Sequence, residues 1–393
     1  MVFDTIIKNG LTVDFQNMKT VTRTLYIKDG LLAQGAEGDT ANAVIDAKGH
    51  YVLPGLIDEH VHLNAFNSNI GANADLLCIP MGVTTAVDAG TCGWTNFEGF
   101  YNYNIVRYVP NVLAYLHVSP YGVHSGCIHE ENHDPADFNE AEIVKMAVKY
   151  RDTIRGLKVR MCTATLGDYG IAPLKRAVEI AGRIEQATGR FCVVDVHYDN
   201  LPQNVTVQEI LETLRPGDVI SHVMQIHGET MFTADGHVRE DLKQARQRGI
   251  WIDDCHGRVH WSFDTLKKAY ADGFYPDIIS SDVVRISTFV RPGSSLVHSM
   301  CVCSAAGMSE LEIFKAVTQT PARALGILDR AGTLDVGKPA DICIMDVQNS
   351  LETYQDWWGG PCKGNKCFIP LMTLKDGVIV YRHRRSSKRS FAH

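Results

Sequence analysis

Short apolar runs alternate with longer amphipathic stretches through the middle of the chain, from about residue 53 to about residue 330. Such runs are typical of buried parallel strands, and the amphipathic stretches between them are typical of helices that cover those strands. The eight runs that we interpret as strands cover residues 56–62, 83–90, 111–118, 154–160, 191–197, 218–223, 249–254 and 277–282. The pattern therefore predicts an α/β fold in which eight βα units close into a (β/α)8 TIM barrel.

Both ends of the chain carry a different pattern, in which short β-like runs are separated by turn residues. The runs lie at residues 4–10, 22–30 and 42–55 near one end, and at residues 332–346 and 374–381 near the other. Strands from the two ends can pair in one sheet beside the barrel. We therefore predict a small, discontinuous, β-sandwich-like domain from residues 1–52 plus 331–393, and a barrel from residues 53–330.

Composition restricts the environment and the partners of the protein. Hydrophobic residues make up 45% of the 393 residues, but no stretch reaches the roughly 18 consecutive apolar residues of a membrane span. The N-terminal segment MVFDTIIKNG lacks the pattern of a signal peptide, and eleven scattered cysteines are typical of reduced thiols. A net charge of -7 argues against binding to nucleic acid. We expect a cytoplasmic protein that binds neither membranes nor nucleic acid.

Residues able to bind metal fall where the predicted strands end. In a parallel barrel the carboxyl ends of all strands meet at one mouth, where barrel enzymes place their chemistry. His60 and His62 are two residues apart, so strand periodicity places both side chains on one face. The polar residues that end the strands are His60, His62, Lys158, His197, His222 and Asp282. A single His-x-His pair is weak evidence, but imidazoles and a carboxylate at four strand ends favour a site for zinc, iron or manganese.

The chain resembles the amidohydrolase superfamily over nearly its whole length. The resemblance rests on the segment PGLIDEHVHL, the strand-ending lysine and histidines, the SSD of the eighth strand, and the later segments TQTPARALGI and GTLDVGKPADICIMD. It implies a hydrolase with two divalent metal ions, most naturally zinc, and a homo-oligomer. In binuclear members the corresponding residues imply one ion on His60, His62 and Asp282, and a second ion on His197 and His222.

Lys158 needs its own chemical explanation, because an ammonium group has no lone pair to give to a cation. In the superfamily the corresponding lysine is carboxylated by carbon dioxide, and the resulting carbamate bridges both ions. The resemblance therefore implies a carbamate on Lys158. The alternative is an ordinary lysine in a salt bridge inside the barrel.

The segments GLKVRMCTATLGDYG, VHYDN and DDCHG narrow the resemblance to a deacetylase-type branch whose members are easily mistaken for dihydroorotases or adenine deaminases. That branch implies hydrolysis of an acyl ester or amide, with acetyl as the acyl group, on a small substrate that carries a carboxylate. A hydroxide shared by the two ions would attack, because metal coordination lowers the pKa of water to about 7. Asp282 would then act as the catalytic base that passes the proton to the leaving group.

Two residues near the strand ends are candidate substrate contacts. Arg160 lies two residues beyond Lys158, so it can share the inward face and bind a substrate carboxylate; a salt bridge to a loop acid is the alternative. His256 follows the seventh strand and can contact substrate or hydrogen-bond a metal ligand, or else be an ordinary buried histidine. Residues 122–134 contain His124, His129 and His133, but their spacing matches no metal motif, so we expect a polar loop there.

Two other classes of function remain open. The first is a different reaction on the same scaffold, either cyclic amide hydrolysis as in dihydroorotases or deamination as in adenine deaminases. The presence of Lys158 argues against the single-metal deaminases, many of which lack this lysine. The second is a non-catalytic interaction protein that has lost metal, which the intact set of ligand types disfavours.

Overall fold

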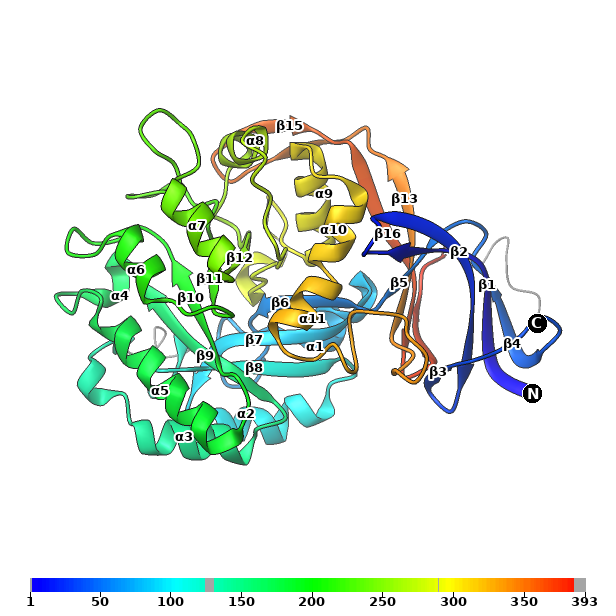
Figure 1. Ribbon diagram of the computed structural model, residues 1–393, viewed down its shortest axis with the longest axis horizontal. Helices are drawn as coiled ribbons and strands as arrows, with labels where there is room; N and C mark the ends of the chain where they lie inside the picture. The colour runs from blue at the N-terminus through cyan, green and yellow to red at the C-terminus, as the bar shows by residue number, and fades with distance from the viewer. Residues whose placement is uncertain (1, 124–130, 289, 385–393) are drawn as a thin grey trace.

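The computed structural model describes residues 2–123, 131–288 and 290–384. Two parts stand side by side in Figure 1: a curled parallel sheet covered by helices, and a second sheet that contains strands from both ends of the chain. No helix among the described residues is long and apolar enough to cross a membrane.

Seven parallel strands form the curled sheet, and each pairs with its neighbours in chain order. They are β6 (Leu56–Val61), β7 (Val83–Gly93), β8 (Asn111–His117), β9 (Ile154–Met161), β10 (Val193–Tyr198), β11 (Val219–Ser221) and β12 (Trp251–Asp253). All seven correspond to predicted strands. Nearly every residue in them is buried, as expected when helices cover one face and other strands face the second.

The predicted eighth strand, residues 277–282, forms only isolated bridges. Ile278 pairs with Asp253, and Val283 pairs with Val61, so the segment connects the last strand of the sheet to the first. Asp282 donates its backbone N–H to the carbonyl of His60 at 2.7 Å. A regular strand does not form here, because Asp282 adopts a left-handed conformation with φ of 46° that an extended ladder excludes.

Helices follow the strands and bury their apolar faces against them. Within the described residues they are α1 (Ala74–Leu77), α2 (Phe97–Tyr103), α3 (Glu140–Lys149), α4 (Thr163–Leu166), α5 (Ala172–Thr188), α6 (Val207–Thr213), α7 (Glu240–Arg248), α8 (Phe263–Ala271), α9 (Leu296–Ala306), α10 (Glu310–Ala316) and α11 (Gln319–Ala324). The amphipathic stretches at residues 141–152 and 174–188 supply most of α3 and α5.

The second sheet joins strands from both ends of the chain, and it contains eight strands. They are β1 (Val2–Asp14), β2 (Lys19–Lys28), β3 (Leu31–Ala33), β4 (Thr40–Asp46), β5 (Tyr51–Pro54), β13 (Ile342–Asn349), β16 (Lys366–Lys375) and β17 (Val378–Arg382). The two ends meet where β5 pairs antiparallel with β13. A separate two-stranded sheet contains β14 (Thr353–Gln355) and β15 (Pro361–Lys363).

One face of the second sheet has a hydrophobic core of its own, which includes Ile7, Ile27, Ile342 and Leu374. The other face packs against the helices of the barrel: the Phe314 ring on α10 lies 5.7 Å from the Phe368 ring on β16. The sheet therefore covers the outside of the barrel. Division of the chain into domains at residues 53 and 330 stays a prediction.

The seam between β6 and the 277–283 segment depends on Ser281. Its backbone N–H and its hydroxyl donate to the two oxygens of the buried Asp58 carboxyl, at 3.0 and 2.5 Å. We expect Ser281→Ala to lower the free energy of unfolding by about 1–3 kcal/mol, because the Asp58 oxygen loses a buried partner. Urea unfolding measures the change. The control is Ser304→Ala, since the buried Ser304 hydroxyl has no hydrogen-bond partner among the described residues. A similar loss in both variants would contradict the role given to Ser281.

Candidate metal centre

The six strand-ending residues singled out in the sequence come together at one end of the barrel. They belong to β6, β9 and β10, directly follow β6 and β11, or lie in the bridging segment, residues 277–283. The four histidines and the lysine are buried, and the Asp282 side chain is 15% exposed. The cluster contains His60, His62, Lys158, His197, His222 and Asp282.

His60, His62 and Asp282 form the first group of candidate ligands. The nearest oxygen of Asp282 lies 3.3 Å from His62 Nε2 and 3.8 Å from His60 Nε2. His62 Nδ1 lies 2.8 Å from the Thr91 hydroxyl, which itself donates to Asp88. Since the hydroxyl proton is used by Asp88, His62 donates its Nδ1 proton to Thr91. The lone pair of His62 therefore lies on Nε2, the nitrogen that faces Asp282.

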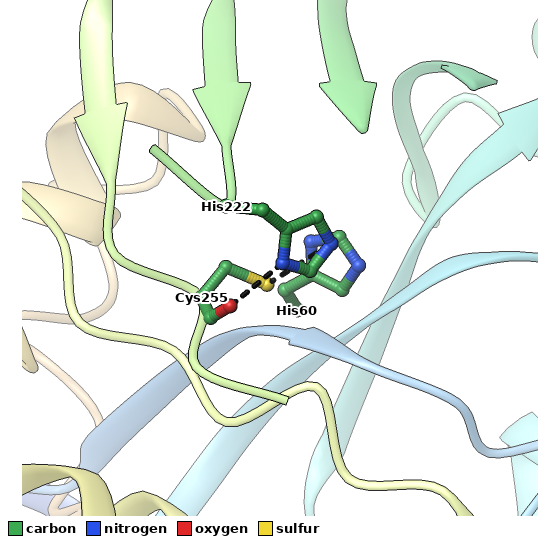
Figure 2. Close-up of side chains that lie close together, drawn as sticks. All are labelled: His60, His222 and Cys255. Carbon is green, nitrogen blue, oxygen red and sulfur yellow. Dashed lines mark hydrogen bonds between the residues drawn. The ribbon is translucent and has the colours of Figure 1, made fainter. Parts of the chain in front are cut away.

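His197 and His222 form the second group, with His260 beside them. The ring centroids of His197 and His222 are 4.4 Å apart. Figure 2 shows the carbonyl and the thiol of Cys255 both directed at the His222 ring, with His60 close by. His222 Nδ1 donates to that carbonyl at 2.7 Å, which leaves the lone pair on Nε2. His197 Nε2 is buried and has no hydrogen-bond partner among the described residues.

Lys158 lies between the groups. Its Nζ is 3.3 Å from His60 Nε2 and donates to Asp195 at 2.5 Å, and both side chains of this ion pair are 1% exposed. Lys158 and Asp195 are partners in the register of β9 and β10. Gly90 makes room for the lysine: with φ of 80°, a Cβ there would meet Lys158 Cβ at 2.7 Å.

Burial keeps the imidazoles of the centre neutral. It lowers the pKa of His60 well below the usual value, and the positive charge of Lys158 lowers it further. Burial and the neighbouring rings do the same to the pKa of His197 and His222. Burial alone would raise the pKa of Asp282, but the surrounding His62, His222 and His260 outweigh it and lower the pKa to about 2. Neutral imidazoles and an ionised carboxylate are the forms that bind metal.

Arg160 lies beside the cluster and is the register partner of His197. Its guanidinium donates to Glu131 at 2.7 Å, which is the loop-acid salt bridge considered as the alternative. The same carboxylate lies 3.0 Å from His117 Nε2 and 2.5 Å from His133 Nε2. Burial would raise the pKa of Glu131, but Arg160 and His117 hold it well below its usual range.

These contacts also bear on whether His117, Glu131 and His133 could themselves bind metal. His117 Nδ1 accepts a hydrogen bond from the Ser119 backbone, so the ring proton lies on Nε2 and points at Glu131. A nitrogen that carries a proton is no metal ligand. We therefore interpret the group as a support for Glu131 and Arg160. His124 and His129 of the same loop lie outside the described residues.

His256 lies in a separate buried group. Its Nε2 is 2.7 Å from Asp254, its ring stacks on Trp261 at 4.8 Å, and the Cys303 thiol lies 3.9 Å away. The structure does not bring this imidazole into the cluster that contains His60 and His222. A substrate contact by His256 stays a prediction.

Several residues of the site were not predicted from the sequence. Asp195 precedes His197 by two positions on a strand, so the periodicity that selects His60 and His62 could also have indicated it. No such signal points to Thr91, Cys255 or His260. Thr91 lies on β7, which offers no predicted ligand, and the other two lie on a loop, where side-chain direction follows no fixed period.

A parallel barrel whose mouth gathers buried imidazoles, a lysine and an aspartate defines the class of metal-dependent barrel hydrolases. The chain belongs to the amidohydrolase family, whose model matches residues 51–380. It is a hydrolytic enzyme of that family, as its relatives' names also indicate.

The chain is 28% identical to a deacetylase from Enterococcus faecalis over 96% of this chain and 99% of the relative. It is 30% identical to a deacetylase from Agrobacterium fabrum, over 83% of this chain and 78% of the relative. Among solved structures, one described as an adenine deaminase superposes with a TM-score of 0.86 at 26% identity, covering 97% of this chain and all of the other. One described as a dihydroorotase gives 0.83 at 26% identity, covering 96% and 99%.

Gly90→Ala should destabilise the protein more than Gly49→Ala does. Both glycines have φ near 80°, so alanine costs roughly 1–2 kcal/mol at either position. A Cβ at Gly49 meets nothing within 4 Å, whereas at Gly90 it overlaps Lys158 and adds about 1–3 kcal/mol. Urea unfolding of both variants measures the difference. Equal losses would show that Gly90 is needed only for its backbone conformation.

Proposed function

We propose that this protein is a binuclear metal-dependent hydrolase that removes an acyl group, acetyl first of all, from an ester or amide of a small carboxylate-bearing substrate. The observation that carries the proposal is the cluster at the barrel mouth, in which four histidines, a lysine and an aspartate converge from the ends of β6, β9, β10 and β11 and from the 277–283 segment. The deacetylase names of two relatives that cover most of the chain support the choice of reaction.

The side chains of the cluster fit two divalent ions. His62 and His222 present Nε2 lone pairs because their Nδ1 protons are taken by Thr91 and the Cys255 carbonyl. His197 Nε2 is buried without a protein partner, which is costly unless something else occupies its lone pair. His60, His62 and Asp282 would hold one ion, and His197 and His222 the other. Bound ions would supply an activated water and a Lewis acid for the substrate carbonyl.

Lys158 completes this set only after modification. As an ammonium it would repel cations 3.3 Å from a candidate ligand nitrogen. We propose that carbon dioxide converts it to a carbamate, whose two oxygens can bind both ions. Zinc suits a donor set of imidazole, carboxylate and carbamate.

Asp282 is the residue that we propose as the catalytic base. The pKa of its carboxyl, lowered to about 2, keeps it ionised at neutral pH, and its side chain remains 15% exposed at the mouth. It can therefore accept a proton from the attacking water and donate it to the leaving oxygen or nitrogen.

Arg160 is the proposed contact for the substrate carboxylate. The hydrogen bond to Glu131 uses one terminal nitrogen, Nη1, and fixes the guanidinium at the mouth, where the side chain is 23% exposed. A guanidinium has five N–H donors, so the Glu131 contact is compatible with a second carboxylate bound by the other terminal nitrogen. An anchored arginine loses less conformational entropy on binding than a free one.

We propose a cytoplasmic enzyme because the ten cysteines that the structure describes are all free thiols. A small-molecule substrate, a homo-oligomer, and the absence of membrane and nucleic-acid partners are proposed as well. A dihydroorotase-like or adenine-deaminase-like reaction is the second candidate, because structures described by those names superpose over nearly the whole chain.

A substrate panel tests the proposal. We expect zinc-loaded protein to release acetate from N-acetyl amino acids or O-acetyl 2-hydroxy acids, and to prefer one configuration. Matched acetyl amides and esters without the carboxylate should react at least about 10-fold more slowly in kcat/KM, because the charged hydrogen bond to Arg160 is worth about 1.5–3 kcal/mol. Turnover of only dihydroorotate or adenine would replace the deacetylase assignment with the second candidate.

Lys158→Ala should lose bound metal and activity together, because the bridging carbamate cannot form. Short carboxylic acids such as formate or acetate should restore part of both. The matched control is Lys375→Ala, which removes a lysine that is similarly buried, against Asp341, in the second sheet. That variant should lose stability but keep its metal, as measured by elemental analysis. Full activity of Lys158→Ala would exclude the carbamate.

A further inference from the structure

The loop that follows β12 carries a histidine into the centre. Gly257, with φ of 53°, brings this loop against the bridging segment: a Cβ at Gly257 would lie 2.6 Å from an Asp282 oxygen. Three residues later the His260 ring lies 4.2 Å from the His222 ring and 5.2 Å from the His197 ring, centroid to centroid. One nitrogen from each of the three rings lies within 4.8 Å of the others.

The His260 ring faces Asp199, the residue that follows β10. His260 Nδ1 faces an Asp199 oxygen at 3.6 Å, and His227 Nδ1 faces the other oxygen at 3.2 Å. At 3.6 Å the two groups are not hydrogen-bonded, and His260 Nδ1 is buried with no hydrogen-bond partner among the described residues. The negative charge of the facing carboxylate still favours the ring proton of His260 on Nδ1. The lone pair then lies on Nε2. A carboxylate behind an imidazole is the usual support of a metal-binding histidine.

We propose that His260 is a third imidazole ligand for the ion held by His197 and His222, with Asp199 as its positioning residue. The inference rests on the proposed binuclear centre and extends it by one ligand. Tetrahedral zinc with bonds of about 2.0–2.1 Å places neighbouring ligand atoms roughly 3.3 Å apart. Three nitrogens within 4.8 Å of one another reach that arrangement if each pair closes by at most about 1.5 Å.

A substrate contact is the alternative role for His260. A ring that donated a hydrogen bond to substrate would need its proton on Nε2, which would leave Nδ1 directing a lone pair at the Asp199 carboxylate. Two facing lone pairs repel each other, so the surroundings of His260 favour the ligand. The same surroundings predict that three neutral imidazoles, those of His197, His222 and His260, bind the ion at this subsite.

The experiment measures metal binding directly. Wild-type protein and the His260→Gln variant are stripped with chelator and titrated with Co²⁺, and bound metal and the visible absorption of the cobalt are recorded. We expect the wild-type protein to bind two ions. In His260→Gln the ion held by His197 and His222 should bind at least about 100-fold less tightly, and the cobalt spectrum should change. Asp199→Asn should weaken the same ion by about 10–100-fold, as loss of a carboxylate behind a ligand does.

Two further variants separate a ligand from a structural residue. His227→Gln removes the other histidine on Asp199 and should bind both ions as wild type does. His260→Asp offers a carboxylate ligand in place of the imidazole and should bind the second ion more tightly than His260→Gln. Circular dichroism of the metal-free proteins checks that each variant is folded.

The outcomes distinguish this inference from the proposed function. If His260→Gln binds both ions with wild-type affinity and an unchanged cobalt spectrum, His260 is not a ligand, although the centre itself stands. If wild-type protein binds no metal at all, the binuclear proposal fails, and the third ligand fails with it.

Discussion

The structure depends on a lysine ammonium enclosed in a barrel. Lys158 is 1% exposed, and a charge so placed costs several kcal/mol unless it is paired and its partner is also satisfied. Asp195 provides the pair, and the Ser221 hydroxyl donates to the other oxygen of Asp195 at 2.6 Å. Nearby, burial raises the pKa of Glu59 to about 8 and holds the pKa of Asp253 well above its usual range. Burial therefore favours the neutral form of both carboxyls.

The charge on the Lys158 side chain determines what the mouth of the barrel can bind. With an ammonium at Lys158 the centre already contains a cation next to His60, and a metal ion there would meet repulsion. A carbamate reverses the sign of the charge at the same position. The neutral imidazoles of His197 and His222 cannot provide that change, because they have no charge to lose.

The fold and the convergence of the six strand-ending side chains could be predicted for one reason: strand ends of a parallel barrel meet at one mouth whatever the loops do. That rule selected His60, His62, Lys158, His197, His222 and Asp282. Their role as metal ligands stays a prediction. The pairing of the two chain ends was predicted from the β-like runs near each end. The roles of loop residues could not be predicted in this way. His256 and His260 lie on one loop, and sequence position favoured the first, although backbone turns at Cys255 and Gly257 bring only the second to the cluster. Glu131 likewise gains its role from contacts that no local pattern encodes.

The sheet outside the barrel has a consequence for how the protein is made. Pro54 and Ile342 are partners in the register of β5 and β13, so an early strand finds its neighbour only when most of the chain has left the ribosome. Until then Val52 and the strand edge around it lack their native cover, and such edges pair readily with other chains. Synthesis therefore passes through a stage at which the edge of β5 that β13 later covers is open to pairing with other chains.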